Sequence, residues 1–349
     1  MAFAHHSLKT DHIFRIASQT KAITSVAVMM LYEEGKFLLD DPISRYIPEF
    51  ANMTVLDKFN AQDSSYTTMP AKTQVTIRQL LTHTSGISYA QIGTKEANAI
   101  YGKANITAGI GVGGGHSLAT DMKKLARLPL MHQPGERWTY GLNTDVLGYL
   151  VEVLSGMTLD EFFRTRIFEP LGMKDTYFNV PSSKQNRLAN LYVEVDGKLS
   201  KAPPVVPYNG VFNVDYPKTG TRYFSGGAGL SSTALDYAIF LQMMLNGGEY
   251  NGKRLLSRNT VRMMTMNQIG DIDFGVNKFG LGFGITTVKG STLLPQNEGS
   301  YEWGGAFATT YWVDPKEKLI GILYRQLWGT THSDASDKYK VMVYSALRN

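Results

Sequence analysis

The 349-residue sequence contains no cysteine, and that absence excludes a disulfide framework, a thiolate metal site and a cysteine nucleophile. Charge is also sparse. Charged residues make up 19% of the chain, and 35 Lys and Arg against 30 Asp and Glu leave a net charge of +5. No run of Lys and Arg forms a concentrated basic face, so a nucleic-acid partner is not expected.

Long hydrophobic runs are missing as well. No stretch reaches the roughly 18 apolar residues of a membrane span, and the first ten residues contain no hydrophobic signal core. We therefore expect no membrane span, and the sequence leaves open a cytoplasmic location or export with a signal absent from this chain. The apolar fraction of 43% is ample for a packed core, and the length has room for about two domains or one large one.

Several motifs of known chemistry are absent too. No Gly-x-Ser-x-Gly elbow occurs, which argues against the α/β-hydrolase fold. The seven histidines, at positions 5, 6, 12, 83, 116, 132 and 332, show no metal-binding spacing. The glycine-rich residues 111–115 lack the Lys-Ser/Thr end of a phosphate-binding loop. No metal and no cofactor is therefore expected.

Periodicity and capping residues predict the regular elements. Helices are expected over residues 18–35, 76–83, 144–155, 158–169, 234–246 and from 337 onward. Strands are expected over 281–288, 306–313 and 319–327, and the last two form an antiparallel hairpin through a tight turn at 314–318. Residues 92–120, rich in Gly and polar side chains, are expected to form a mobile loop, and 180–230 an irregular segment.

The order of these elements indicates a fold class. Because strands gather near the C-terminus and helices in the middle, we expect an α+β fold in which helices flank an antiparallel sheet. We expect one α/β domain from residues 1–50 and 216–349, and a mainly helical inserted domain from residues 51–215. The active site is expected at their junction.

A candidate nucleophile stands at the start of the first predicted helix. Ser18 and Lys21 are one helical turn apart, so their side chains share a face. A serine hydroxyl needs a group that takes its proton, and a lysine whose pKa is lowered by burial can do so. The alternative is an ordinary serine N-cap followed by a surface lysine. The apolar lead-in at 13–17 and the single occurrence of the Ser-x-x-Lys spacing favour catalysis.

Residues 14–21, which read FRIASQTK, resemble the active-serine segment of the serine β-lactamase-like superfamily. That group includes class C β-lactamases, D-Ala-D-Ala peptidases and the family VIII carboxylesterases. The likeness continues in order through residues 80–87 (LLTHTSGI), 134–140 (PGERWTY), 145–148 (DVLG), 226–233 (GGAGLSST) and 303–315. Each segment alone is weak, but the ordered set is specific. It implies a β-lactamase/transpeptidase-like fold, closest to the family VIII carboxylesterases.

The resemblance assigns a second catalytic position to Tyr140. A phenol is a poor base at neutral pH unless nearby cations depress its pKa, and Lys21 would be that cation. Tyr140 or Lys21 would then relay the proton from Ser18 to the leaving group. Core packing is the alternative for any single tyrosine. Relatives often carry asparagine two residues later, where this chain has Leu142, and that difference weakens a lactamase interpretation.

The third position of the family motif distinguishes the substrate classes. Lactamases and peptidases usually have Lys-Thr-Gly on a strand facing the serine, whereas this chain has Trp303, Gly304 and Gly305, as family VIII esterases do. Tryptophan offers an apolar wall and no ion pair for a substrate carboxylate. The literal Lys-Thr-Gly at residues 218–220 precedes the C-terminal strands and is interpreted as a decoy.

The oxyanion hole is expected from the backbone N–H groups of Ser18 and Ala306. His83 is expected to be a structural hydrogen-bonder, and His332, after the last strand, is a candidate for the border of the pocket. Relatives usually carry several dozen residues before the active serine. Either the gene start is truncated here, or the sheet is smaller and leaves an uncovered edge that invites pairing with another chain. We therefore expect a homodimer or a swapped arrangement.

Together these observations predict a serine carboxylesterase that hydrolyses short- to medium-chain esters through an acyl-enzyme on Ser18. Trp303, Gly304 and Gly305 would contact the substrate, a small-molecule ester. Two alternatives remain open. The first is a β-lactamase or a D-Ala-D-Ala-type peptidase, and the second is a non-catalytic penicillin-binding-like protein.

Overall fold

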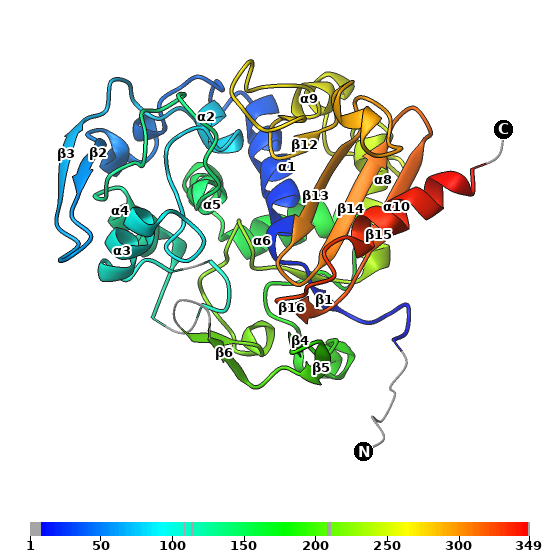
Figure 1. Ribbon diagram of the computed structural model, residues 1–349. Coiled ribbons are helices and arrows are strands. Elements are labelled where there is room, and N and C mark those ends of the chain that lie inside the picture. Colours follow the sequence, from blue (N-terminus) through cyan, green and yellow to red (C-terminus); the bar gives the residue numbers. More distant parts are fainter. Residues whose placement is uncertain (1–7, 108, 113–114, 208–210, 348–349) are drawn as a thin grey trace.

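The computed structural model describes residues 8–107, 109–112, 115–207 and 211–347. Its main sheet has five antiparallel strands in the order β11-β12-β13-β14-β15. These strands are β11 (Lys278–Phe279), β12 (Gly284–Ile285), β13 (Tyr301–Gly305), β14 (Thr309–Asp314) and β15 (Leu319–Leu323). Helices lie on both faces of the sheet (Figure 1), and the predicted α+β class is confirmed.

Alternation along β14 determines which helix covers each face of the sheet. Neighbouring residues of a strand point to opposite faces. Tyr311 contacts Tyr237 of α8 (Ala234–Leu245), with ring centres 5.3 Å apart. Trp312 contacts Tyr339 of α10 (Ala335–Ser345), with ring centres 5.7 Å apart. The sheet is therefore enclosed between α8 and the C-terminal helix.

The C-terminal hairpin was predicted correctly, although its strands are shorter than expected. β14 pairs with β15 from Asp314↔Leu319 to Thr310↔Leu323. Asp314 closes the turn, because its carboxylate accepts hydrogen bonds from the backbone N–H groups of Lys316 and Glu317 at 3.0 and 3.2 Å. The strand expected over 281–288 is reduced to β12, and β13 holds Trp303 as expected.

The helices around residue 20 were also predicted well. α1 (Thr20–Glu33) follows a single 3-10 turn, η1 (Ala17–Gln19), and ends just before Gly35, which has a φ of +71°. α1 is buried on nearly all sides, between the main sheet and α5 (Asn143–Ser155). α2 (Ile77–Leu81) and α8 also lie where they were expected, and α9 (Arg258–Met264) was not predicted.

The fourth predicted helix continues further than the sequence suggested. α6 (Leu159–Phe163) runs through a π-helical stretch, Arg164–Phe168, into α7 (Glu169–Leu171). The expected end before Pro170 was wrong. Pro170 lies in the last turn of this continuous helix, which ends at Gly172 with a φ of +75°.

The expectation of a structureless loop over 92–120 was wrong. α3 (Lys95–Lys103) and α4 (Leu118–Leu125) occupy most of it, and residues 108, 113 and 114 lie outside the described part. Thr94 caps α3 through the Ala97 N–H and Ser117 caps α4 through the Thr120 N–H. The high glycine content of this segment favoured a loop prediction, so these two helix caps were not recognised in the sequence.

The region 180–230 also contains more structure than expected. β4 (Tyr192–Val195) and β5 (Lys198–Lys201) form a hairpin whose turn residues Asp196 and Gly197 both have positive φ, as an Asp-Gly turn requires. Two further antiparallel pairs lie in residues 51–215, so this region is less purely helical than predicted. They are β2 (Thr54–Phe59) with β3 (Tyr66–Pro70), and β6 (Val205–Pro207) with β7 (Val211–Asn213).

The remaining strands are short. β1 (Phe14–Arg15) pairs with β8 (Ser231–Ser232), and β9 (Glu249–Tyr250) pairs with β10 (Lys253–Arg254). β16 (Leu327–Trp328) runs parallel to β4. In the part of the chain that the structure describes, no helix has both the length and the apolar character to span a bilayer.

Candidate active site

Ser18 lies at the N-terminal entrance of α1, in the turn η1 that follows β1. The preceding residue, Ala17, has a φ of +44°, in the left-handed region that non-glycine residues rarely adopt. Such strain persists only where the surroundings fix the backbone, and it concentrates at functional sites. Ser18 itself is half-buried, so its hydroxyl is accessible at the end of an otherwise buried segment.

Lys21 is brought to Ser18 by the first turn of α1. Its side chain is 2% exposed, and its Nζ donates to Ser18 Oγ at 3.4 Å. It also donates to the phenol oxygen of Tyr89 at 3.0 Å and to the carbonyl of Gly227 at 2.7 Å. The predicted Ser18–Lys21 pair is therefore within contact distance, with the amine held by two further oxygen acceptors.

Buried polar side chains anchor the start of α1. Thr24 Oγ1 donates to the Gly226 carbonyl at 2.7 Å, and Thr20 Oγ1 accepts from the Leu230 N–H at 3.1 Å. The segment 226–230 thus lies against the helix turn that carries Lys21. Because the hydroxyls of Thr20 and Thr24 have partners, α1 tolerates these two polar residues inside the core.

Tyr140 stands beside Lys21, just before α5 begins. The Lys21 Nζ lies 4.6 Å from the centre of the Tyr140 ring. Trp138 stacks on Tyr140 with ring centres 5.8 Å apart and an interplanar angle of 10°, and Trp303 approaches from β13 at 5.7 Å. The cation thus contacts the phenol ring, and three of the aromatic residues noted in the sequence gather at one place.

Two aromatic residues complete this wall without having been predicted. Phe279 lies 5.3 Å from Trp303, and Phe274 lies 4.7 Å from Trp138, both measured between ring centres. They come from the segment between α9 and β12. No local pattern marks them in the sequence, because their role depends on where that segment folds back.

Tyr89 is the polar residue of the site that the sequence reasoning missed. It is buried, it accepts the hydrogen bond from Lys21, and its ring centre lies 5.3 Å from that of Tyr140. It follows the 80–87 segment by two residues, so an extension of that motif would have included it. The site therefore holds two phenols beside one amine, which is hydrogen-bonded to the Tyr89 hydroxyl and contacts Tyr140 through its ring.

The C-terminal end of β13 approaches the residues before Ser18. A Cβ atom at Gly305 would lie 2.4 Å from the Ile16 carbonyl oxygen and 2.3 Å from Thr309 Oγ1. Only glycine permits this approach. Ala306, the next residue, is exposed in the turn between β13 and β14. The strand end that would carry the second oxyanion donor is therefore close to the serine turn.

His83 is fully buried behind the aromatic wall. Its ring lies 5.1 Å from Tyr140, and its Nδ1 is 3.0 Å from Asn143 Nδ2. Burial lowers its pKa well below the ordinary value, and the Lys21 charge acts in the same direction. A neutral His83 accepts from the amide at the start of α5, which fits the structural role expected for it.

The remaining sequence candidates lie elsewhere. The His332 side chain is 74% exposed and 3.9 Å from Glu194. Lys218, in the literal Lys-Thr-Gly, pairs with Asp215 at 2.9 Å on the surface. His5 and His6 fall outside the described residues. Across residues 8–107, 109–112, 115–207 and 211–347, no group of three or more His, Asp or Glu side chains could hold a metal ion.

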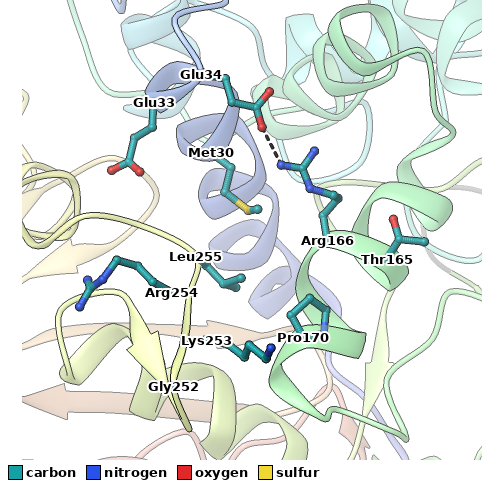
Figure 2. Close-up of a pocket in the computed structure, with 10 residues that line it drawn as sticks. All are labelled: Met30, Glu33, Glu34, Thr165, Arg166, Pro170, Gly252, Lys253, Arg254 and Leu255. Atoms are coloured by element: carbon teal, nitrogen blue, oxygen red, sulfur yellow. Dashed lines mark hydrogen bonds and ion pairs between the residues drawn. The ribbon is translucent and has the colours of Figure 1, made fainter.

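Two cavities differ in their relation to the site. Figure 2 shows one of about 520 Å³ at the far end of α1, where Met30, Glu33 and Glu34 face Arg166 and the β9–β10 hairpin. Another, of about 330 Å³, borders the site itself, because Trp303 and Gly304 line it together with Phe274 and residues of α10. This cavity lies largely on the α10 side of the sheet, and Ser18, Lys21 and Tyr140 do not line it.

Comparisons with known proteins identify the family of this chain. A family model, Beta-lactamase, matches residues 2–345. A lovastatin esterase of Penicillium rubens is 30% identical over 338 residues, covering 89% of this chain and 79% of that protein. A putative D-alanyl-D-alanine carboxypeptidase of Escherichia coli is 29% identical over 352 residues, covering 95% and 72%.

A solved structure shares the fold. EstCE1, a hydrolase with promiscuous acyltransferase activity, superposes with a TM-score of 0.81 at 22% identity, covering 96% of this chain and 86% of that chain. The fold and site therefore define a serine hydrolase. The chain belongs to the β-lactamase family, and its relatives include both esterases and peptidases.

Proposed function

We propose that this protein is a serine carboxylesterase that hydrolyses short- to medium-chain esters through an acyl-enzyme on Ser18. The observation that supports this most directly is the contact of Ser18 Oγ with the buried Lys21 Nζ at 3.4 Å, beneath an aromatic wall. The wall favours an apolar acyl or alcohol group. No metal or cofactor is needed for this chemistry.

The proposed reaction has two stages. Tyr140, beside the Lys21 ammonium, accepts the proton of Ser18 as Oγ attacks the ester carbonyl. The carbonyl oxygen becomes an oxyanion that the N–H groups of Ser18 and Ala306 receive. The C–O bond to the alcohol breaks, and the alcohol leaves with the proton. Water, activated by the same phenol, then hydrolyses the acyl-enzyme and restores Ser18.

The choice of an ester over a carboxylate-bearing lactam or peptide rests on Trp303. It stands in β13, where lactamases and peptidases present a lysine, and its ring faces Tyr140 and Phe279. Peptidase activity is the second candidate, because relatives include a putative D-alanyl-D-alanine carboxypeptidase. Comparing a p-nitrophenyl butyrate with a chromogenic cephalosporin and a D-Ala-D-Ala peptide separates these candidates. A preference for either of the last two would overturn the esterase assignment.

Active-site labelling tests the nucleophile itself. A fluorophosphonate probe should label the wild-type chain, and Ser18→Ala should abolish the labelling. Ser25→Ala is a matched control, because Ser25 is a buried serine two turns further along α1. Absence of labelling in the wild type would favour a non-catalytic penicillin-binding-like protein. Equal labelling of wild type and Ser18→Ala would contradict the role of Ser18.

The homodimer expected from the sequence remains a proposal. β15 is the last strand in the order of the main sheet, and an uncovered strand edge is able to pair with another chain. Light scattering at several protein concentrations tests it. A mass that stays near 38.7 kDa throughout would rule out the dimer.

A further inference from the structure

The ammonium of Lys21 is buried among neutral acceptors. In the part of the chain that the structure describes, its hydrogen bonds go to a hydroxyl, a phenol and a peptide carbonyl. A buried cation is costly unless a negative charge compensates it. The fold must therefore hold a compensating charge further away, or the site would favour the neutral amine.

A carboxyl group lies directly behind one of these acceptors. Asp145, in the first turn of α5, is 0% exposed. Its Oδ1 accepts from Ser225 Oγ at 2.7 Å and from Tyr223 Oη at 3.4 Å. Its Oδ2 is buried and faces the backbone of Gly227, whose N–H also acts to lower the pKa of the carboxyl. The proposed reaction does not use this group, and the sequence motif that contains it gave it no role.

Gly227 separates the carboxyl from the ammonium. Lys21 Nζ donates to the Gly227 carbonyl at 2.7 Å, and a Cβ atom at Gly227 would lie 2.6 Å from Asp145 Oδ2. The glycine therefore leaves the space that the carboxyl occupies. The backbone of Gly227 therefore lies between the two groups.

The groups that face Asp145 come from several elements. Lys21 approaches from α1, Tyr223 and Ser225 from the segment before β8, and Gly109 from the loop before α4. Burial raises the pKa of Asp145, while the bond from Ser225 and the charge of Lys21 oppose that rise. Lys21 is the cation that acts on this carboxyl. Asp121, on α4, acts on Tyr223 and is bonded to His116 at 2.7 Å.

We propose that Asp145 is the counter-charge of Lys21, a positioning residue that holds the ammonium charged and directed at Ser18 from behind the Gly227 peptide. The inference rests on the proposed function only where it gives this charge pair a part in catalysis. The pairing of Asp145 with Lys21 does not itself depend on esterase activity. The start of α5 and the residues just before it would then place Asp145 and Tyr140 around the amine. The buried pair is compensated without placing a carboxylate against the nucleophile.

The titration of Lys21 tests this charge pairing without any substrate. Protein labelled with 13C,15N-lysine gives Cε and Nζ resonances, and Lys21→Met assigns those of residue 21. In Asp145→Asn, Lys21 should lose its proton about one pH unit or more below the wild-type value, as expected when a neighbouring opposite charge is removed. Asp121→Asn, which changes a second buried carboxyl beyond Tyr223, should leave the titration unchanged. Identical titrations in wild type and Asp145→Asn would overturn the proposal.

A reciprocal measurement avoids dependence on one variant. If Asp145→Asn fails to fold, Lys21→Met reports the same coupling, because removing the cation must shift the ionisation of Asp145 to higher pH by an equal amount. The Asp145 carboxyl is followed by 13C NMR in protein labelled at aspartate Cγ. An unchanged Asp145 titration would refute the pairing. If fluorophosphonate labelling fails, the proposed esterase function is overturned but the charge pairing is not, because neither titration depends on turnover.

Discussion

Lys21 donates its hydrogen bond to the phenol oxygen of Tyr89 at 3.0 Å while lying 4.6 Å from the ring centre of Tyr140. The amine thus contacts two phenols in different ways: it hydrogen-bonds to the hydroxyl of Tyr89, and it lies against the ring of Tyr140. Tyr89 is buried, whereas Tyr140 is half-buried beside the aromatic wall. A proton acceptor must reach both the nucleophile and the leaving group, which favours Tyr140 as the base and Tyr89 as the residue that fixes the amine.

This division of roles predicts different losses for two matched substitutions. Tyr140→Phe should lower kcat for p-nitrophenyl butyrate by about 10²- to 10⁴-fold, the usual contribution of a general base. Tyr89→Phe should lower it by less than about tenfold, because Lys21 keeps two other acceptors. The measurement is steady-state kinetics on both variants. A larger loss in Tyr89→Phe than in Tyr140→Phe would exchange the two roles.

The approach of β13 to the serine turn predicts a strong effect at Gly305. A methyl group there would lie 2.4 Å from the Ile16 carbonyl oxygen, so the strand end must shift away from Ser18. Gly305→Ala should lower kcat by about 10²- to 10³-fold, as loss of an oxyanion donor does. Gly102→Ala, in α3 with open space around it, serves as the control and should leave kcat unchanged. Near-normal kcat in Gly305→Ala would argue against an oxyanion hole at this strand end.

The parts of the site that were predictable are those encoded locally. Ser18 and Lys21 are three residues apart on one helix, so their proximity follows from helical geometry alone. Likewise, the turn at Asp314 needs only contacts within a few residues. α3 was missed because a count of glycines over 92–120 outweighed the cap at Thr94, although Ala97, Ile100 and Tyr101 form a buried stripe.

The contacts around the amine could not be predicted in the same way. Tyr89 and Gly227 meet Lys21 across 68 and 206 residues of sequence. Such contacts depend on how α5 and the 226–230 segment pack on α1. This packing cannot be predicted from the hydrophobic periodicity of the sequence. The resemblance to known hydrolases supplied the position of Tyr140 but gave no role to Asp145. The family pattern therefore indicated where the site lies, and the tertiary packing determined how its charges are arranged.

The position of Trp303 leads to a prediction about how KM depends on the acyl chain length of the substrate. Its ring lies 5.3 Å from Phe279 and borders the 330 Å³ cavity beside α10. Trp303→Ala should raise KM for p-nitrophenyl octanoate by about tenfold, since roughly 1–2 kcal/mol of apolar burial is lost, with little change for the acetate. Trp303→Phe should restore most of the difference. Equal changes for both esters would mean that the wall does not contact the variable part of the substrate.

The buried His83 predicts a pH dependence of stability. Its folded pKa lies well below 6.5, so as the pH falls below about 6.5 the unfolded chain binds a proton that the folded chain does not. Stability should therefore fall with pH on the acid side. One such group contributes at most about 1.4 kcal/mol per pH unit. His83→Gln should reduce the loss in free energy of unfolding between pH 6.5 and 5 by about 1–2 kcal/mol, measured by urea denaturation.

His132 provides an internal comparison for this prediction. Burial also lowers its pKa, and its Nε2 is 2.8 Å from Thr139 Oγ1, away from Lys21. His132→Gln should reduce the acid-side loss in the same direction but by less, because burial lowers the pKa of His83 further than that of His132. If His83→Gln loses stability on acidification as steeply as the wild type, then His83 is protonated in the folded chain. The amide of Asn143, which donates to its Nδ1, would then have to rotate, and the start of α5 would lose the contact that positions Tyr140.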